Sequence, residues 1–376
     1  MKNNNKNYQQ ALDYITQCYR EALFPEKEFM FYENRRDYKN EFRTGIYTPE
    51  DMEKMFFKVL DEDFTDQERQ IILNLDPNFD IIKTLLVQRS NGHHIHLYPY
   101  VDTHDIDGYS YLRKKDISLD DKRDKLAEFW GNMENQITCS IKTGYSTSQN
   151  ESNALFYPRL TPKGRNYDYY GRNYEMLLQD IQNLAPEFLE NFKILVADVE
   201  KERNSKHPTV HAYTHGDFHD FNYDGLFWDL DTFGNNPITN DFAIYFWHFF
   251  SREDNLVPKY NYWLSKYMDN QLDENELSDV RDEKQIIVEN YYNLIRDMFI
   301  QEGKGDVFER EITLKLFCRA FLIDNVLKFD EQDRKQVYAF WQNYMEKLGT
   351  QDFEKEILFP HNANNIDDAF GMEEEK

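Results

Sequence analysis

The sequence predicts an α+β fold with two lobes, a small antiparallel sheet followed by a larger, mainly helical part. Its 376 residues are too many for one simple hydrophobic core, which favours two lobes. Short segments rich in Phe, Tyr, Met and Ile occupy residues 28–98 and indicate strands. After residue 118, apolar residues recur at intervals of three and four and indicate helices. Hydrophobic residues make up 40% of the chain, enough for a packed interior although 30% of the residues are charged.

The first hundred residues predict one helix and then a sheet. Residues 8–23 form an amphipathic pattern, with apolar residues at helical spacing: Leu12, Ile15, Cys18, Tyr19 and Leu23. Strands are predicted at 28–32, 41–47, 54–60, 81–88 and 94–98. Thr65 or Asp66 can cap a helix that reaches about Leu75, between the third and fourth strands.

The rest of the chain predicts helices, with few interruptions. A long helix from Ser118 to about Ile141 has an apolar face made of Leu126, Phe129, Trp130 and Met133. Residues 142–168 predict an irregular loop, and residues 172–202 predict two helices broken near Pro186. Helices continue after Asp241 to about residue 348, with breaks at Pro258 and at 302–306. We therefore divide the chain into an N-terminal helix (1–27), a sheet lobe (28–101), a helical lobe (102–361) and an acidic tail (362–376).

Charge and composition exclude several classes of partner. The net charge of −25 argues against nucleic acid and against an anionic membrane surface, both of which attract clustered Lys and Arg. It suits a cationic small molecule, or simply keeps the protein in solution. The three cysteines are far apart and form neither a disulfide framework nor a metal spacing. No apolar stretch follows the first residues, and the most apolar run, 242–250, is about half a membrane span, so we expect a cytoplasmic protein.

Residues 211–243 form a polar cluster flanked by apolar and aromatic residues. Asp217 follows His-Gly, and Gly216 permits a turn that a larger residue would resist. A carboxylate at Asp217 could orient an attacking hydroxyl, as phosphoryl transfer requires. Asn222 and Asp229 supply the hard oxygen ligands that Mg²⁺ prefers, and an Asp-Gly hairpin at 223–226 would fold one toward the other. This combination predicts a phosphoryl-transfer site.

The cluster resembles the catalytic region of the aminoglycoside phosphotransferase and choline kinase superfamily, which shares the protein-kinase fold. The matching pattern is His-Gly-Asp, Asn five positions after the Asp, then Trp-Asp-Leu-Asp-Thr-Phe-Gly and Asp-Phe-Ala. The resemblance implies Asp217 as the catalytic base and Asn222 and Asp229 as Mg²⁺ ligands, with Asp241 bracing the loop from the head of a helix. Asp231 is the alternative principal ligand, because the Asn222–Asp229 spacing is shorter than usual in the family. The spacing from Asp229 to Gly234 and Asp241 favours Asp229.

The same resemblance assigns nucleotide contacts to the sheet lobe. Lys58, inside an apolar strand, resembles the lysine that holds the α- and β-phosphates of ATP, and Glu68 is its expected partner. The alternative is a lysine that faces solvent. The register of the last strand gives the Pro99 carbonyl and the Val101 N–H to the adenine.

The implied activity is ATP-dependent transfer of phosphate to a hydroxyl of a small molecule, such as an amino sugar or a choline-like amino alcohol. One alternative is a metal-dependent hydrolase in which Zn²⁺ is held by ligands from one cluster: His211, His215, Asp217, His219 and Asp220. Another is a kinase-like binding protein without catalysis. If the kinase hypothesis holds, His211 is a packing or surface residue and His215 organises the loop that carries Asp217. His219 and Asp220 are then ordinary loop residues.

Overall fold

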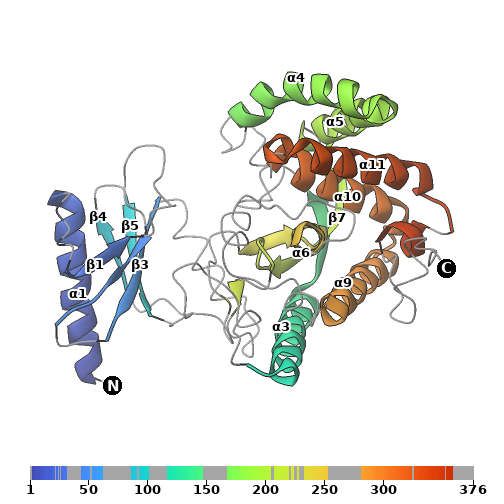
Figure 1. Ribbon diagram of the computed structural model, residues 1–376. Coiled ribbons are helices and arrows are strands. Elements are labelled where there is room, and N and C mark those ends of the chain that lie inside the picture. Colours follow the sequence, from blue (N-terminus) through green and yellow to red (C-terminus); the bar gives the residue numbers. More distant parts are fainter. Residues whose placement is uncertain are drawn as a thin grey trace. The chain divides into compact units, whose positions relative to one another are not determined.

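The computed structural model describes residues 2–21, 23, 25, 27–31, 44–50, 53–61, 86–90, 93–100, 117–146, 167–204, 207–219, 222–223, 227, 233–252, 281–323, 326–351 and 353–358. The chain divides into two compact units (Figure 1). The first unit comprises Met1–Tyr111 and Phe221–Asp231, and the second comprises Leu112–Asp220 and Thr232–Lys376. Helices and small antiparallel sheets make up the described residues, so the α+β class is confirmed.

Within the described residues of the first unit, five strands form an antiparallel sheet in the order β1-β2-β3-β5-β4. The strands are β1 (Phe29–Phe31), β2 (Thr44–Tyr47), β3 (Met55–Asp61), β4 (Leu86–Ser90) and β5 (His93–Pro99). Each overlaps a predicted strand, although β4 was predicted at 81–88 and overlaps that range only at residues 86–88. The helix expected from residue 65 to 75 lies outside the described residues.

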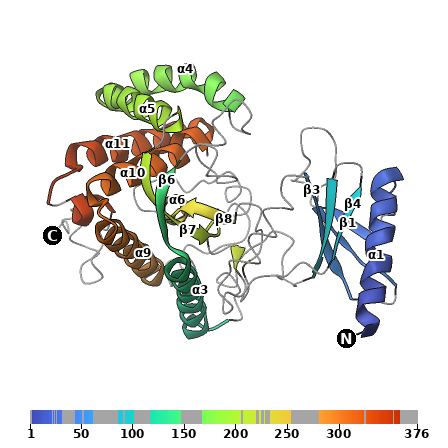
Figure 2. The same cartoon turned by 180° about the vertical axis from the view of Figure 1, so that it is seen from behind.

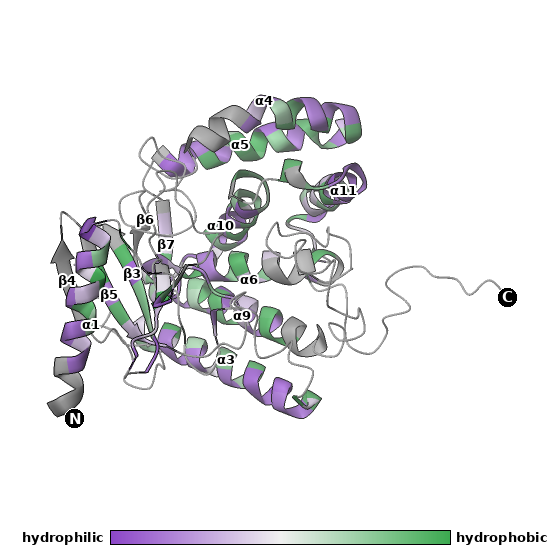
Figure 3. Cartoon of the chain, turned by 60° about the vertical axis from the view of Figure 1, so that its left-hand side comes forward, coloured by the Kyte–Doolittle hydropathy of each residue, from purple (hydrophilic) through white to green (hydrophobic). Residues whose placement is uncertain are grey.

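Helix α1 (Lys2–Glu21) covers one face of this sheet (Figure 3). Leu12, Ile15 and Cys18 are buried against strand residues that include Phe57 and Ile95. The prediction for Leu23 was wrong, because the helix ends at Glu21 and the Leu23 side chain is 65% exposed. The Tyr14 hydroxyl donates to Glu28 Oε2 at 2.6 Å and ties the helix to the start of β1.

Helices make up most of the described residues of the second unit (Figure 2). They are α3 (Leu119–Ser140), α4 (Tyr167–Leu184), α5 (Leu189–Asn204), α6 (Ile238–Arg252), α9 (Arg281–Gln301), α10 (Gly305–Phe317) and α11 (Glu331–Lys347). The Ser118 hydroxyl caps α3 by accepting from the Asp121 N–H at 3.1 Å. Pro186 opens a short 3₁₀ turn between α4 and α5, which confirms the predicted break.

A small antiparallel sheet lies within the second unit, with strand order β6-β7-β8 among the described residues. Its strands are β6 (Lys142–Ser146), β7 (His207–Thr214) and β8 (Gly234–Pro237). Residues 142–146 were predicted as loop, and this was wrong; the first residues of the polar cluster, 211–214, also lie in a strand. The segment Lys-Thr-Gly-Tyr-Ser has no alternating apolar pattern, and an edge strand needs only one neighbour to form its hydrogen bonds.

The described side chains of helix α6, residues 238–247, are all buried in the second unit. Phe242, Ile244, Tyr245 and Trp247 are each at most 2% exposed and belong to the core. The helix packs against α9 and α10 and contacts β7. A helix that is apolar all round belongs in the interior, so α6 provides a fixed base for the segments beside it.

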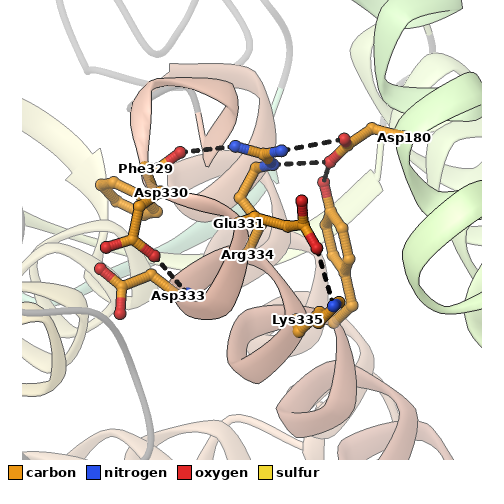
Figure 4. A network of polar contacts seen from close by, with 8 residues as sticks. Asp180, Phe329, Asp330, Glu331, Asp333, Arg334 and Lys335 are labelled. Carbon is orange, nitrogen blue, oxygen red and sulfur yellow. Dashed lines mark hydrogen bonds and ion pairs between the residues drawn. The ribbon is translucent and has the colours of Figure 1, made fainter.

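A polar network joins α4 to α11, and we call it the α4–α11 joint (Figure 4). Arg334 of α11 donates from Nε to Asp180 Oδ2 at 2.8 Å and from Nη2 to Asp180 Oδ1 at 3.2 Å. Its Nη1 donates to the Phe329 carbonyl at 2.6 Å, and the Tyr338 hydroxyl donates to Asp180 Oδ2 at 2.6 Å. A two-pronged arginine–carboxylate pair of this kind fixes both geometry and charge.

A search of the described residues for membrane-crossing helices finds none with the necessary length and apolar character.

Candidate active site

Strand β7 leads directly into the segment that carries Asp217. Its last residue, Thr214, pairs with Gly234 at the start of β8. The Tyr213 N–H donates to the Ser140 hydroxyl at 3.0 Å, which links β7 to the C-terminal end of α3. The strand end is thus held by a neighbouring strand and by a helix, and the residues that follow leave it from a fixed position.

Residues 215–219 form a tight turn, which we call the 215–219 loop. Gly216 has φ of 79°, in the left-handed region that favours glycine. The Asp217 N–H donates to His215 Nδ1 at 3.3 Å, so this ring nitrogen acts as an acceptor and carries no proton. His215 is fully buried, and its bond across the turn supports its expected part as an organiser of the loop.

Phe218 anchors the loop in the core. Its ring stacks on Phe129 of α3, with centroids 4.3 Å apart and planes 6° apart. It also lies near Tyr245 of α6 and meets Tyr291 of α9 edge-on. The sequence interpretation did not single out Phe218. The signal was an aromatic residue directly after the Asp, in a segment otherwise made of polar side chains and glycine.

The carboxylate of Asp217 remains partly exposed, and His219 lies beside it. The distance from His219 Nε2 to Asp217 Oδ2 is 3.6 Å, and the His219 side chain is nearly buried. His219 was interpreted as an ordinary loop residue, yet it contacts the predicted catalytic group. His219 follows Asp217 by two positions in the sequence, and the turn at Gly216 allows the two side chains to approach each other.

Asp241, in the first turn of α6, lies fully buried behind the loop. Burial raises the pKa of its carboxyl to about 7, and the charge of Asp217 adds to this rise. The Thr214 side chain and the backbone N–H groups of Gly216 and His215 oppose it, because they favour the charged carboxylate. Asp241 thus lies near the backbone of the 215–219 loop, at the helix head where the sequence expects a brace.

The other described candidates belong to the first unit. Lys58 lies in the middle of β3 and is only 4% exposed, so the solvent-facing alternative was wrong. Its neighbours Phe57 and Val59 pack toward α1, and alternation along the strand places Lys58 on the opposite face. Pro99 ends β5, opposite Met55 of β3. Asn222 is buried and precedes Tyr223, which forms an antiparallel bridge with Phe227, so the chain reverses its direction between these two residues.

Several candidates lie outside the described residues: Glu68, Val101, Asp220, Asp229 and Asp231. Of the expected Mg²⁺ ligands, the structure therefore describes Asn222. Its amide oxygen is a hard donor that suits Mg²⁺, and the reversal between Tyr223 and Phe227 turns the chain back after it. These two features fit a magnesium site that takes few protein ligands.

The histidines of the cluster do not gather around a common point among the described residues. Searching that part of the chain finds no group of three His, Cys, Asp or Glu side chains suited to hold a metal ion. His211 is buried in β7, where burial and the nearby positive charge of Lys315 lower its pKa to about 4. It is therefore a neutral core histidine at physiological pH.

Comparison with models of known protein families finds no match, and a search of curated proteins finds no significantly similar sequence.

Proposed function

We propose that this protein is an ATP-dependent phosphotransferase with a two-lobed, protein-kinase-like fold, which moves the γ-phosphate to a hydroxyl of a small molecule. The observation that carries the proposal is the setting of Asp217. Its carboxylate is partly exposed on a turn whose backbone is fixed by His215, Gly216 and Phe218, with Asp241 buried behind. A catalytic base in phosphoryl transfer mainly orients the attacking hydroxyl, so a firmly positioned carboxylate is what the chemistry needs.

The sheet unit supports the nucleotide part of the proposal. Protein kinases carry the lysine that binds the α- and β-phosphates on the third strand of the sheet. Lys58 lies on β3 and is buried although charged, which is unusual for a lysine without a defined task. Glu68 is its proposed partner, and Pro99 and Val101 are proposed to contact the adenine.

The proposed cofactors are ATP and Mg²⁺. Asn222 and Asp229 would hold the metal, with Asp231 as the alternative to Asp229. When bound, Mg²⁺ neutralises charge on the phosphates. Asp217 accepts a hydrogen bond from the acceptor hydroxyl and takes its proton as the phosphate is transferred. Lys58 holds the α- and β-phosphates in place.

The acceptor is proposed to be cationic, such as an amino sugar or a choline-like amine. The net charge of −25 attracts cations, and the aromatic content of 16% supplies ring faces on which an ammonium group can rest. This choice depends on composition and is the part of the proposal that an assay decides.

The test is ADP formation from Mg·ATP with amino alcohols, aminoglycosides, sugars and nucleosides as acceptors. We expect one acceptor class to support turnover that stops when Mg²⁺ is chelated. Asp217→Ala should abolish phosphate transfer while ATP binding persists. Asp198→Ala, which removes a partly exposed carboxylate on α5, should leave phosphate transfer unchanged. Zn²⁺-dependent hydrolysis without ATP would favour the hydrolase alternative. Nucleotide binding without turnover of any acceptor would favour a binding protein.

A further inference from the structure

Helix α10 and the π-helical turn that follows it, Cys318–Ile323, bury a row of charged side chains in the second unit. Glu311, Lys315 and Arg319 are spaced by four residues and therefore share one face. They are 5%, 0% and 6% exposed. Buried charges are costly unless they are paired or hydrogen-bonded, so their retention in the interior calls for a physical reason.

Glu311 joins three elements of the second unit through a single oxygen. Its Oε1 accepts a hydrogen bond from the Thr209 hydroxyl at 2.5 Å and another from the Thr239 hydroxyl at 2.6 Å. Thr209 lies on β7, Thr239 lies in the first turn of α6, and both are fully buried. Hydrogen bonds to a carboxylate are short and strong, so Glu311 fixes β7 and the head of α6 to the same point on α10.

Both of these elements lead to the 215–219 loop. Strand β7 runs from Thr209 to its end at Thr214, where the loop begins. Thr239 precedes Asp241 by two residues, and Asp241 lies near the loop backbone. The first turn of α6 has a second attachment, because the Tyr291 hydroxyl donates to the Ile238 carbonyl at 3.2 Å. A displacement of Thr239 would therefore move Asp241, and with it the support of the loop.

We propose that Glu311 is a positioning residue for Asp217, acting through Thr239 and Asp241. The proposal rests on the proposed phosphotransferase function. The competing interpretation is that Glu311 only holds helices and strands together. The two differ in one respect: a positioning residue lowers kcat in protein that remains folded, whereas a packing residue lowers stability alone.

The variants separate the acceptor oxygen from the bulk of the side chain. Glu311→Gln keeps an oxygen that can accept from both threonines, whereas Glu311→Leu fills similar space without one. We expect Glu311→Leu to lower kcat about 10- to 100-fold, the size of effect that a small misplacement of a catalytic group produces. The KM for ATP should stay near that of the parent protein, and Glu311→Gln should recover most of the kcat.

Single threonine variants show whether Glu311 acts on the 215–219 loop through Thr239 or through Thr209. Thr239→Val should lower kcat more than Thr209→Val, because Thr239 adjoins Asp241. Thr313→Val is the matched control. The Thr313 hydroxyl is also buried on α10, but it contacts the Glu309 carbonyl and the Tyr344 hydroxyl. It should affect stability without changing kcat.

Amide hydrogen exchange over residues 212–219, measured on the same variants, reports on the loop without any turnover. Faster exchange in Glu311→Leu, parental exchange in Thr313→Val and recovery in Glu311→Gln support the proposal, even if the parent protein transfers no phosphate and the proposed function fails. If the parent is active, a folded Glu311→Leu variant with parental kcat and parental exchange overturns the positioning role and leaves the function intact. A loss of kcat in Thr313→Val equal to that in Glu311→Leu would also overturn it.

Discussion

The α4–α11 joint and the region behind the 215–219 loop each hold a carboxyl group at least partly away from water, but the surroundings of the two groups differ. In the joint, both oxygens of Asp180 accept from Arg334, and one also accepts from Tyr338. Behind the loop, Asp241 is fully buried, and its carboxyl pKa is raised to about 7. The Thr214 side chain and the backbone N–H groups of Gly216 and His215 favour its charged form without cancelling the cost of burial.

The comparison shows that burial of the Asp241 carboxyl lowers the stability of the folded protein at neutral pH, whereas the Asp180 pair does not. A carboxylate with an arginine fork contributes to folding, because its desolvation is offset by charge-assisted bonds. A buried carboxyl with a raised pKa lowers stability at neutral pH and persists where the surrounding structure requires it. A locally unfavourable arrangement of this kind is expected at functional sites, and under the proposed function it lies in the support of Asp217.

The largest expected effect comes from removing the anchor of the loop. Phe218→Ala should lower the free energy of unfolding by about 3–5 kcal/mol, because it deletes a fully buried ring from the cluster with Phe129, Tyr245 and Tyr291. Urea unfolding measures this change. Phosphate transfer should also be lost in the fraction that remains folded, because without the Phe218 ring the 215–219 loop is no longer held against the core.

Phe340→Ala is the matched control for Phe218→Ala. Phe340 is a buried ring on α11 that packs against Trp341 and Tyr344. Its removal should lower stability without lowering kcat in the folded fraction. Equal kcat values in the two variants would show that Phe218 contributes packing only.

A second prediction concerns pH and the carboxyl of Asp241. Its pKa is about 7 in the folded protein against an ordinary value of 3.8, so the folded state keeps a proton that the unfolded state releases. Its contribution to stability is full below about pH 4 and is lost as pH rises to about 7. The slope in this window is about 1.4 kcal/mol per pH unit. Asp241→Asn carries no titratable group and should remove this slope.

The measurement is the difference in unfolding free energy between the parent and Asp241→Asn at several pH values. Taking the difference cancels His211, whose lowered pKa of about 4 makes stability fall in the opposite direction, as pH drops below 6.5. We expect the variant to gain relative to the parent from pH 4 to 7 and to change little above. A difference that does not vary with pH would contradict the raised pKa.

Much of the fold follows from local signals. Ser118 predicts the start of α3 because its hydroxyl can cap a helix, and Pro186 predicts a break because it lacks an N–H. The strand at 142–146 could not be predicted, because its order comes from pairing with β7, more than sixty residues away. Tertiary partners of this kind leave no periodic pattern in the sequence.

The sequence suggests residues for the candidate site but not their structural support. The His-Gly-Asp spacing makes Asp217 a candidate, yet its contact with His219 depends on a turn that the sequence alone does not define. Glu311 and Lys315 are spaced like an exposed salt-bridging pair on a helix surface, and both are buried. Burial of this kind is decided by packing around α10.

One paired measurement tests the central claim most directly: kcat and melting temperature for Asp217→Asn and Asp180→Asn. Both substitutions replace a carboxylate by an amide of the same shape. Asp217→Asn should abolish phosphate transfer and leave the melting temperature near that of the parent. Asp180→Asn should keep kcat and lower stability by about 1–2 kcal/mol, because one arm of the arginine fork loses its charged acceptor. Parental turnover in Asp217→Asn would contradict the account.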